Sequence, residues 1–271
     1  MPDGRPIGVF DSGVGGLTVT RAIADLLPNE SIRYVGDGAH FPYGPRSVEQ
    51  IRGFALDIAA HLVSRDVKLL VVACNSIEVS AIGDIAAGHG VPVIGVINPG
   101  ARAAIRATRN GRIGVIGTEA TIATGAYQRA IGSSAVLVAA ACPAFVEHVE
   151  RGDTTSDALR AAAQGYLAPL KEDAIDTLIL GCTHYPLLAG LLQLEMGSDV
   201  VLVSSAEETA KDVYAELVGG DRLRGSAEPP SHVFTTTGAV DGFRHLAERF
   251  WGRELEHVDV EHTQLEGAAW S

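Results

Sequence analysis

The sequence predicts an α/β protein with two domains, each built on a mostly parallel sheet. Short apolar runs alternate with segments of helical period along almost the whole chain, a pattern typical of βαβ units. The chain has 271 residues, of which 46% are hydrophobic, so it is long and apolar enough for two modest cores. The number of alternating units therefore favours two domains over one.

Strands are predicted where an apolar run rich in Val, Ile and Leu has the length of a strand buried on both faces. In chain order, these runs are residues 6–10, 32–36, 68–73, 93–97, 113–117, 135–140, 176–181, 200–203 and 232–236. The segments between them have helical period, for example residues 17–27, 48–65, 100–109, 119–131, 156–170 and 206–218. The last fifteen residues carry little pattern, and no element is predicted there.

Two stretches are the expected crossings between the domains. One is Asn98-Pro99-Gly100, which has the composition of a turn, and the other lies around residues 204–208. These crossings divide the chain into a discontinuous first domain, residues 1–98 plus 208–271, and a second domain, residues 99–207.

The composition argues against several classes of protein. The net charge of −12 is unfavourable for sequence-independent binding of nucleic acid, which needs Lys and Arg to neutralise phosphates. No apolar run approaches the roughly 18 residues of a membrane span, and Met1 to Arg5 carry no apolar stretch of signal-peptide length. The three cysteines fit no disulfide framework. We expect a cytoplasmic protein with free thiols and no membrane partner.

Two matched cysteine motifs carry the strongest functional signal. Cys74 follows the apolar run 69–73, and Cys182 follows the apolar run 177–181; each cysteine precedes two polar residues. Because α/β sheets place their ligands at the carboxyl ends of strands, two equivalent strand ends can present two thiols to one substrate. That arrangement suits a base and an acid acting on opposite faces of one carbon. An isolated cysteine at such a place is more often a small core residue, and this is the role expected for Cys142.

A glycine-rich turn follows the first predicted strand, in the segment from Gly8 to Leu17. Glycines let a ligand approach the backbone closely, and the helix start that follows favours a carboxylate or phosphate. Asp11 ends the strand, where it either orients a base or caps the helix. The spacing is that of neither a Walker loop nor a dinucleotide-binding turn.

Three further positions have both a structural and a functional interpretation. The loop at Pro42-Tyr43-Gly44 is either a rigid turn or a carboxylate-binding loop. Thr118 and Thr121 follow another strand end and serve as helix caps or as ligand contacts. Glu150, considered by itself, is a solvated surface carboxylate.

Several chemistries lack their residues. The chain has no Gly-x-Ser-x-Gly elbow and no His/Cys cluster with zinc-binding spacing. Its only lysines are Lys68, Lys171 and Lys211, of which the first opens a strand and the others lie in helical surface patterns. A pyridoxal phosphate enzyme needs a Schiff-base lysine, so this cofactor is not expected. We expect neither a metal nor an organic cofactor.

In the order of its motifs, the chain resembles the glutamate racemases of the aspartate/glutamate racemase superfamily. The matching segments run in family order over roughly residues 6–210 and comprise residues 8–19, 42–44, 73–76, 95–100, 114–118 and 181–188. The resemblance implies two doubly wound α/β domains with the active site in the cleft between them. It also implies a homodimer and cofactor-independent interconversion of L- and D-glutamate, which supplies D-glutamate for peptidoglycan synthesis.

The resemblance further implies roles for individual residues. Cys74 and Cys182 are the two acid/base thiols; Asp11 supports Cys74, and His184 with Glu150 supports Cys182. The glutamate substrate is held by the substrate-binding residues, namely Ser12, Pro42, Tyr43, Gly44, Asn75, Ser76, Thr121 and Thr183.

Two positions leave this interpretation open. Glu147 lies close to Glu150 and competes with it for the same role. Where the family usually has small residues after its first cysteine motif, this chain has Ile77-Glu78-Val79. A carboxylate facing the pocket would repel a dicarboxylate substrate, whereas one facing solvent is favourable in the first turn of a helix. We expect Glu78 to face solvent.

Three alternatives to glutamate racemisation remain at this stage. The first is a racemase for aspartate or for a broader set of amino acids. The second is a glutamate-binding regulatory protein that has lost turnover, although both thiols and His184 are present. The third is a cysteine hydrolase that uses Cys182 with His184, which would leave Cys74 without a role.

Overall fold

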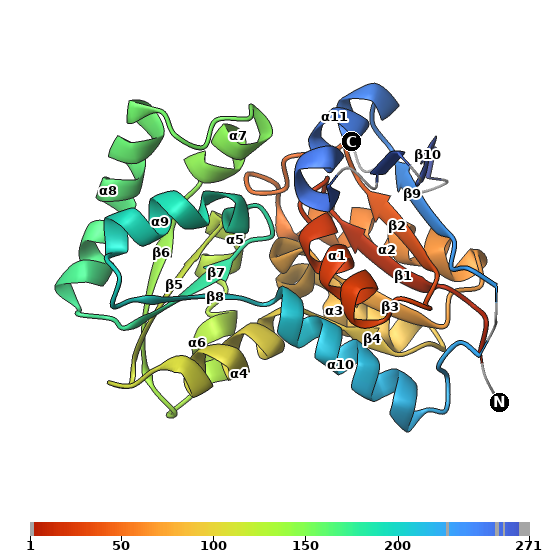
Figure 1. The fold of residues 1–271 in the computed structure, drawn as a ribbon, viewed down its shortest axis with the longest axis horizontal. Coiled ribbons are helices and arrows are strands. Elements are labelled where there is room, and N and C mark those ends of the chain that lie inside the picture. The colour runs from red at the N-terminus through yellow and green to blue at the C-terminus, as the bar shows by residue number, and fades with distance from the viewer. Residues whose placement is uncertain (1–2, 226–227, 253–254, 257, 266–271) are drawn as a thin grey trace.

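The computed structural model describes residues 3–225, 228–252, 255–256 and 258–265, and it contains two parallel sheets flanked by helices (Figure 1). The first sheet has six strands in the order β10-β9-β2-β1-β3-β4, and the second has four in the order β6-β5-β7-β8. The strands of the first sheet are β1 (Ile7–Asp11), β2 (Ile32–Gly36), β3 (Leu69–Val72), β4 (Val93–Ile94), β9 (His232–Thr236) and β10 (Asp259–His262). Those of the second are β5 (Arg112–Gly117), β6 (Val136–Ala141), β7 (Thr177–Gly181) and β8 (Val201–Ser204).

Helices connect these strands and lie around both sheets, with α4 and α10 near the boundary between the two groups (Figure 1). The helices near the first sheet are α1 (Leu17–Leu26), α2 (Val48–Ser64), α3 (Asn75–Gly88), α10 (Ala206–Gly219) and α11 (Val240–Trp251). Those near the second are α4 (Ile97–Ala107), α5 (Glu119–Ala123), α6 (Ala126–Ile131), α7 (Ala144–Glu150), α8 (Asp157–Glu172), the 3₁₀ helix η1 (Tyr185–Leu188) and α9 (Ala189–Met196).

The predicted α/β class with parallel sheets is confirmed. Strands β1, β3 and β7 are buried along their whole length, as expected for continuous apolar runs covered on both faces. In each sheet the next two strands in the chain pair with opposite edges of the first strand: β2 and β3 flank β1, and β6 and β7 flank β5. Such switch points create a crevice beyond the carboxyl ends of the strands, and the two crevices provide the site described below.

Four predictions about elements were wrong or incomplete. The helix predicted over 119–131 is two helices, because Gly125 adopts a left-handed conformation with φ of 65° and separates α5 from α6. The helix predicted over 100–109 is α4, which begins at Ile97, so residues 98–100 lie inside its first turns, where Pro99 is tolerated. The strand predicted over 93–97 ends at Ile94. Strand β10 was not predicted at all, since its residues are mostly polar and exposed.

The division of the chain into two domains at residues 98/99 and 207/208 stays a prediction. The strands before residue 95 and after residue 231 belong to one sheet, and those between 112 and 204 belong to the other. In the described part of the chain, no helix is both long and apolar enough to cross a membrane.

Candidate active site

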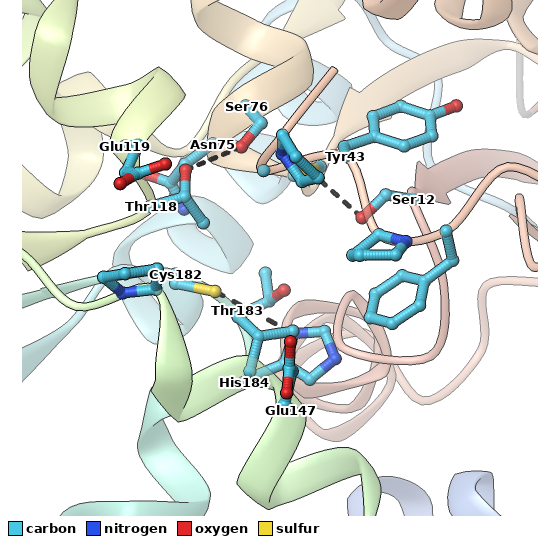
Figure 2. A pocket seen from close by; sticks show the side chains of 17 residues that line it. Ser12, Tyr43, Asn75, Ser76, Thr118, Glu119, Glu147, Cys182, Thr183 and His184 are labelled. Atoms are coloured by element: carbon cyan, nitrogen blue, oxygen red, sulfur yellow. Dashed lines mark hydrogen bonds between the residues drawn. The ribbon is translucent and has the colours of Figure 1, made fainter. Parts of the chain in front are cut away.

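A cavity of about 200 Å³ lies between the two sheets, beyond the carboxyl ends of β1, β3, β5 and β7 (Figure 2). It is smaller than the ~300–1,000 Å³ of sites for drug-sized ligands, and so fits a small substrate. Both matched cysteines line this cavity, one from each sheet. Figure 2 shows Cys182 and Ser12 on opposite sides of it, with His184 and Thr183 along one wall.

Cys74 occupies the N-cap position of α3, directly after β3. Its side chain is buried, and its Sγ lies 3.6 Å from Ser12 Oγ, to which it donates a hydrogen bond. Burial, together with the negative charge of Asp11, raises the pKa of this thiol to about 12. Cys74 is therefore protonated at neutral pH, which is the state of a proton donor.

The Asp11 carboxylate ends β1 and is fully buried. It accepts hydrogen bonds from the Gly13 N–H (3.0 Å) and from the Thr183 hydroxyl (3.2 Å), which comes from the other sheet. Ser12 Oγ also lies 3.4 Å from Asp11 Oδ1. Asp11 thus reaches Cys74 through Ser12 rather than by direct contact. Burial raises the pKa of Asp11, and the nearby His184 opposes that rise.

Cys182 lies beside a histidine that is paired with a carboxylate. His184 Nδ1 is 3.8 Å from Cys182 Sγ, and His184 Nε2 is 2.7 Å from Glu150 Oε1. Burial by itself would lower the pKa of His184, but its hydrogen bonds and charge interactions with Cys182 and Glu150 outweigh that effect and raise the pKa to about 10. The imidazole is therefore cationic at neutral pH, and a cation at this place stabilises negative charge on the Cys182 sulfur.

Most of the predicted site residues come together at the cavity. Ten of them line it, namely Ser12, Pro42, Tyr43, Gly44, Cys74, Asn75, Ser76, Cys182, Thr183 and His184. Asp11 and Glu150 do not line the cavity but contact residues that do. Thr121 lies behind Thr118, whose hydroxyl donates to Thr121 Oγ1 at 3.0 Å, so Thr118 is the threonine at the cavity wall.

The Tyr43 hydroxyl is not oriented for a substrate. It is buried and donates to Asp37 Oδ2 at 2.6 Å, which fixes the loop that carries Pro42 and Gly44. The same carboxylate accepts from the Thr237 hydroxyl at 2.5 Å. Tyr43 therefore shapes the cavity wall, and the role of Tyr43 as a substrate-binding residue stays a prediction.

Sequence reasoning missed several lining residues, namely Phe41, Pro45, Glu119, Pro143 and Val146, and considered Glu147 only as a competitor of Glu150. Glu119 comes directly after a strand end and its cap, so the rule that ligands lie at carboxyl ends of strands was a signal that pointed to it. Glu147 lies on the cavity wall, whereas Glu150 pairs with His184. The two carboxylates of α7 therefore have different surroundings, and Glu150 is the one that contacts the histidine. Phe41 also packs near the His184 ring, at a centroid distance of 5.9 Å.

Glu78 faces neither solvent nor the cavity, so our expectation for it was wrong. Its carboxylate is buried and accepts hydrogen bonds from the backbone N–H groups of Val96 and Ile97. The side chain is not part of the cavity lining. Glu78 is therefore not placed to repel a dicarboxylate substrate in the cavity.

Two observations bear on cofactors. Lys68 Nζ is buried 2.6 Å from Glu30 Oε2, and none of the three lysines lines the cavity. Among the residues described by the structure, no group of three or more His, Cys, Asp or Glu side chains is arranged to hold a metal ion.

Comparison with known proteins assigns the chain to a family. Residues 7–213 match the model of the Asp/Glu/Hydantoin racemase family. The chain is 53% identical over 260 residues to a glutamate racemase of Parafrankia sp., covering 95% of this chain and 94% of that protein. It is 54% identical over 260 residues to a glutamate racemase of Mycobacterium tuberculosis, covering 95% and 96%.

Solved structures give the same result. A glutamate racemase of Bacillus anthracis superimposes with a TM-score of 0.91 at 43% identity, covering 97% of this chain and 99% of the other. A glutamate racemase of Francisella tularensis, solved in complex with D-glutamate, superimposes with a TM-score of 0.90 at 33% identity, covering 97% and 99%. The chain thus belongs to the Asp/Glu/hydantoin racemase family and, within it, to the glutamate racemases.

Proposed function

We propose that this chain interconverts L- and D-glutamate with two thiols: one, as the thiolate, removes the α-proton, and the other donates a proton to the opposite face of the α-carbon. One observation carries the proposal: Cys74 and Cys182 line a single cavity, and each comes from the end of a central strand in a different sheet. A substrate bound between the sheets therefore has one sulfur on either side of its α-carbon.

The unlike surroundings of the two sulfurs define the first step. In one direction the Cys182 thiolate, stabilised by the His184 cation, removes the α-proton, and the Cys74 thiol donates a proton to the opposite face. The stereocentre is inverted, and the proton now lies on Cys182 while Cys74 carries the negative charge. The reverse reaction starts from that second state and exchanges the two roles. Neither a metal nor an organic cofactor takes part in these steps.

The carbanion needs electrostatic support from the cavity wall. Asn75 Nδ2 is buried without a hydrogen-bond partner among the described residues. The amide oxygen of the same side chain accepts a hydrogen bond from the Tyr127 hydroxyl. A buried, unused donor beside Cys74 is suited to a substrate carboxylate. The start of α3 adds the favourable field of a helix N-terminus. Ser76, after a strand of the first sheet, and Thr118, after a strand of the second, supply hydroxyls that lie 2.9 Å apart.

Glutamate is the substrate we assign, rather than aspartate. The relatives and solved structures named above are glutamate racemases, and the Francisella tularensis enzyme was solved with D-glutamate. An aspartate racemase homologue shares only 16% identity and supports the fold alone. We place the reaction in the cytoplasm, since the described cysteines are all free thiols, and assign its D-glutamate to peptidoglycan synthesis. The homodimer implied by the resemblance stays a prediction.

The test is α-proton exchange in D₂O with purified, reduced protein. We expect deuterium incorporation and loss of optical rotation with glutamate, and much slower turnover with aspartate. Replacing either cavity cysteine by Ser is expected to reduce racemisation by at least ~10²-fold, since a positioned acid or base contributes about that much. Cys142→Ser is the matched control, because Cys142 is buried outside the cavity and its loss leaves both sulfurs in place. A Cys74→Ser enzyme that racemises at the normal rate would refute the mechanism.

A further inference from the structure

Glu78 joins the helix that carries Cys74 to the helix that leads into the second sheet. Its backbone N–H donates to Cys74 O at 3.0 Å, so it closes the first turn of α3. Its carboxylate oxygen Oε2 accepts from Val96 N at 2.5 Å and from Ile97 N at 3.0 Å. These two N–H groups open α4, which follows the last strand of the first sheet before the chain enters the second.

The carboxylate acts as the N-terminal cap that α4 lacks in its own sequence. The N-cap residue of α4 is Val96, which has no side-chain acceptor, and the first N–H groups of a helix need partners. Glu78 supplies both the acceptor and a negative charge at a helix N-terminus, where such a charge is favourable. A carboxylate with only 7% exposure is costly to bury unless it has such partners.

Gly95 is matched to this carboxylate. A Cβ built on Gly95 would lie 2.3 Å from the Glu78 carboxyl carbon, which is far inside contact distance. Glycine at position 95 is therefore what allows the Glu78 side chain to reach the start of α4. The two residues form one local device, although they lie 17 positions apart in the chain.

Two other side chains of the first turn of α3 also contact elements that follow α4 in the chain. Asn75 Oδ1 accepts from the Tyr127 hydroxyl of α6 at 2.8 Å, and Ser76 Oγ lies 2.9 Å from the Thr118 Oγ1 that caps α5. The first turn of α3 is thus held at three points by α4, α6 and the cap of α5. Of these three links, the one through Glu78 does not involve a cavity-lining residue.

We propose that Glu78 is a positioning residue: it fixes the first turn of α3 against the start of α4 and thereby sets where the Cys74 thiol lies relative to Cys182. The proposal rests on the two-thiol function described above. Burial raises the pKa of Glu78 to about 7, which agrees with a carboxyl group held for its hydrogen bonds at some electrostatic cost.

Two substitutions at Glu78 separate positioning from bulk stability. In Glu78→Gln one side-chain oxygen still accepts both N–H groups, so we expect kcat to stay close to that of the wild type. Glu78→Ala leaves the start of α4 uncapped, and we expect kcat to fall about tenfold or more with a small change in KM, since small displacements of reacting groups are costly. If Glu78→Ala lowers the melting temperature but leaves kcat of the folded protein unchanged, the residue is only structural and the proposal fails.

A double-mutant cycle with Gly95 gives an independent test. Gly95→Ala in the wild type forces the carboxylate away from Val96 and should lower kcat about as much as Glu78→Ala does. In the Glu78→Ala background the space is empty, so Gly95→Ala should have little further effect; contacting residues show such coupling. Strictly additive losses in kcat would contradict the proposal. A wild-type protein that exchanges no α-deuterium would instead refute the proposed function, so the two failures are distinguishable.

Discussion

The two cavity sulfurs have chemically different neighbours. Cys74 is connected through Ser12 to a buried carboxylate, whereas Cys182 lies 3.8 Å from a histidine that is paired with Glu150. Burial raises the pKa of the Cys74 thiol to about 12, so Cys74 is suited to donate a proton. The pKa of His184 is raised to about 10, so a cation lies beside the second sulfur.

The first prediction concerns the charge on His184. Glu150→Gln removes an anion that helps raise the pKa of His184 to about 10, so that pKa should fall. The alkaline limit of kcat/KM should then move to lower pH, which a rate profile from pH 6 to 10 measures. Glu147→Gln is the control, since Glu147 lies at the cavity wall and does not pair with His184. An unchanged profile in Glu150→Gln would contradict this role.

The same histidine predicts how stability depends on pH. Its pKa is raised from an ordinary 6.5 to about 10 in the folded protein, so folding favours the protonated form. This contribution to the free energy of unfolding is fully present below about pH 6.5 and is lost as the pH rises through about 10. Denaturant unfolding at several pH values should show a smaller alkaline loss of stability in His184→Asn than in the wild type. Equal losses would show that other groups dominate.

How far single residues could be predicted depends on what holds them. The cysteines and their polar followers could be predicted, because a strand end and a motif locate them. The choice of Glu150 over Glu147 came from the resemblance alone, since both lie on α7 three residues apart and packing decides which of them pairs with His184. The buried position of Glu78 could not be predicted for another reason: its partners are backbone N–H groups, and the pattern of side chains in the sequence does not indicate them.

At the scale of elements, the glycine turn after β1 fits closely against the turn after β7. A Cβ on Gly15 would lie 2.4 Å from Thr183 Oγ1 and 2.5 Å from His184 Nδ1. The two turns come from different sheets, so the absence of a side chain at position 15 allows them to meet. The glycine pattern in the sequence indicated a ligand approach, whereas the structure shows that this glycine admits another part of the protein.

A prediction at the scale of elements follows from that fit. Gly15→Ala should displace Thr183 and His184 and lower kcat by roughly 10-fold to 100-fold, since a misplacement of about 1 Å has effects of that size. Steady-state kinetics with glutamate measures it. Gly83→Ala in α3 is the control, because a Cβ there has no atom within 4 Å and should stabilise the helix by roughly 0.5–1 kcal/mol. Normal kinetics in Gly15→Ala would mean that the turns have room to separate.

Most strands could be predicted to within one or two residues. Central parallel strands such as β3 and β7 are apolar on both faces, so a run of Val, Ile and Leu marks them directly. Strand β10 lies at an edge and has the sequence Asp-Val-Glu-His with mostly exposed side chains, so nothing apolar marks it. The break between α5 and α6 depends on the positive φ of Gly125, which a helical pattern does not reveal.

At the scale of the whole molecule, one apolar cluster includes residues of both sheets. It contains Ile7 and Val9 of β1 together with Leu178 and Leu180 of β7, and it extends to Trp251 of α11. A continuous core of this kind couples the stability of the two halves. The cavity therefore lies between parts that depend on each other for folding.

This core predicts a single cooperative unfolding transition. Far-UV circular dichroism and tryptophan fluorescence should give the same midpoint in denaturant, because unfolding of either half removes its side of the shared cluster and destabilises the other half. Glutamate should raise that midpoint without splitting it, because a concentration 100 times its Kd adds about 2.7 kcal/mol to the free energy of unfolding. Two separate transitions would show that the halves fold independently.

Cys74 and Cys182 have different neighbours, yet the equilibrium between the two substrates limits how far the kinetic constants of the two directions can differ. Mirror-image amino acids have equal free energies in water, so the equilibrium constant of the reaction is one. The Haldane relation then requires kcat/KM to be the same for L- and D-glutamate, although the two directions begin from different charge states of the sulfurs. Any difference between the directions must appear in kcat and KM together, in equal proportion. One of the two charge states of the sulfurs is the more populated in the free enzyme. The enantiomer that binds this state should therefore have the lower KM and the lower kcat.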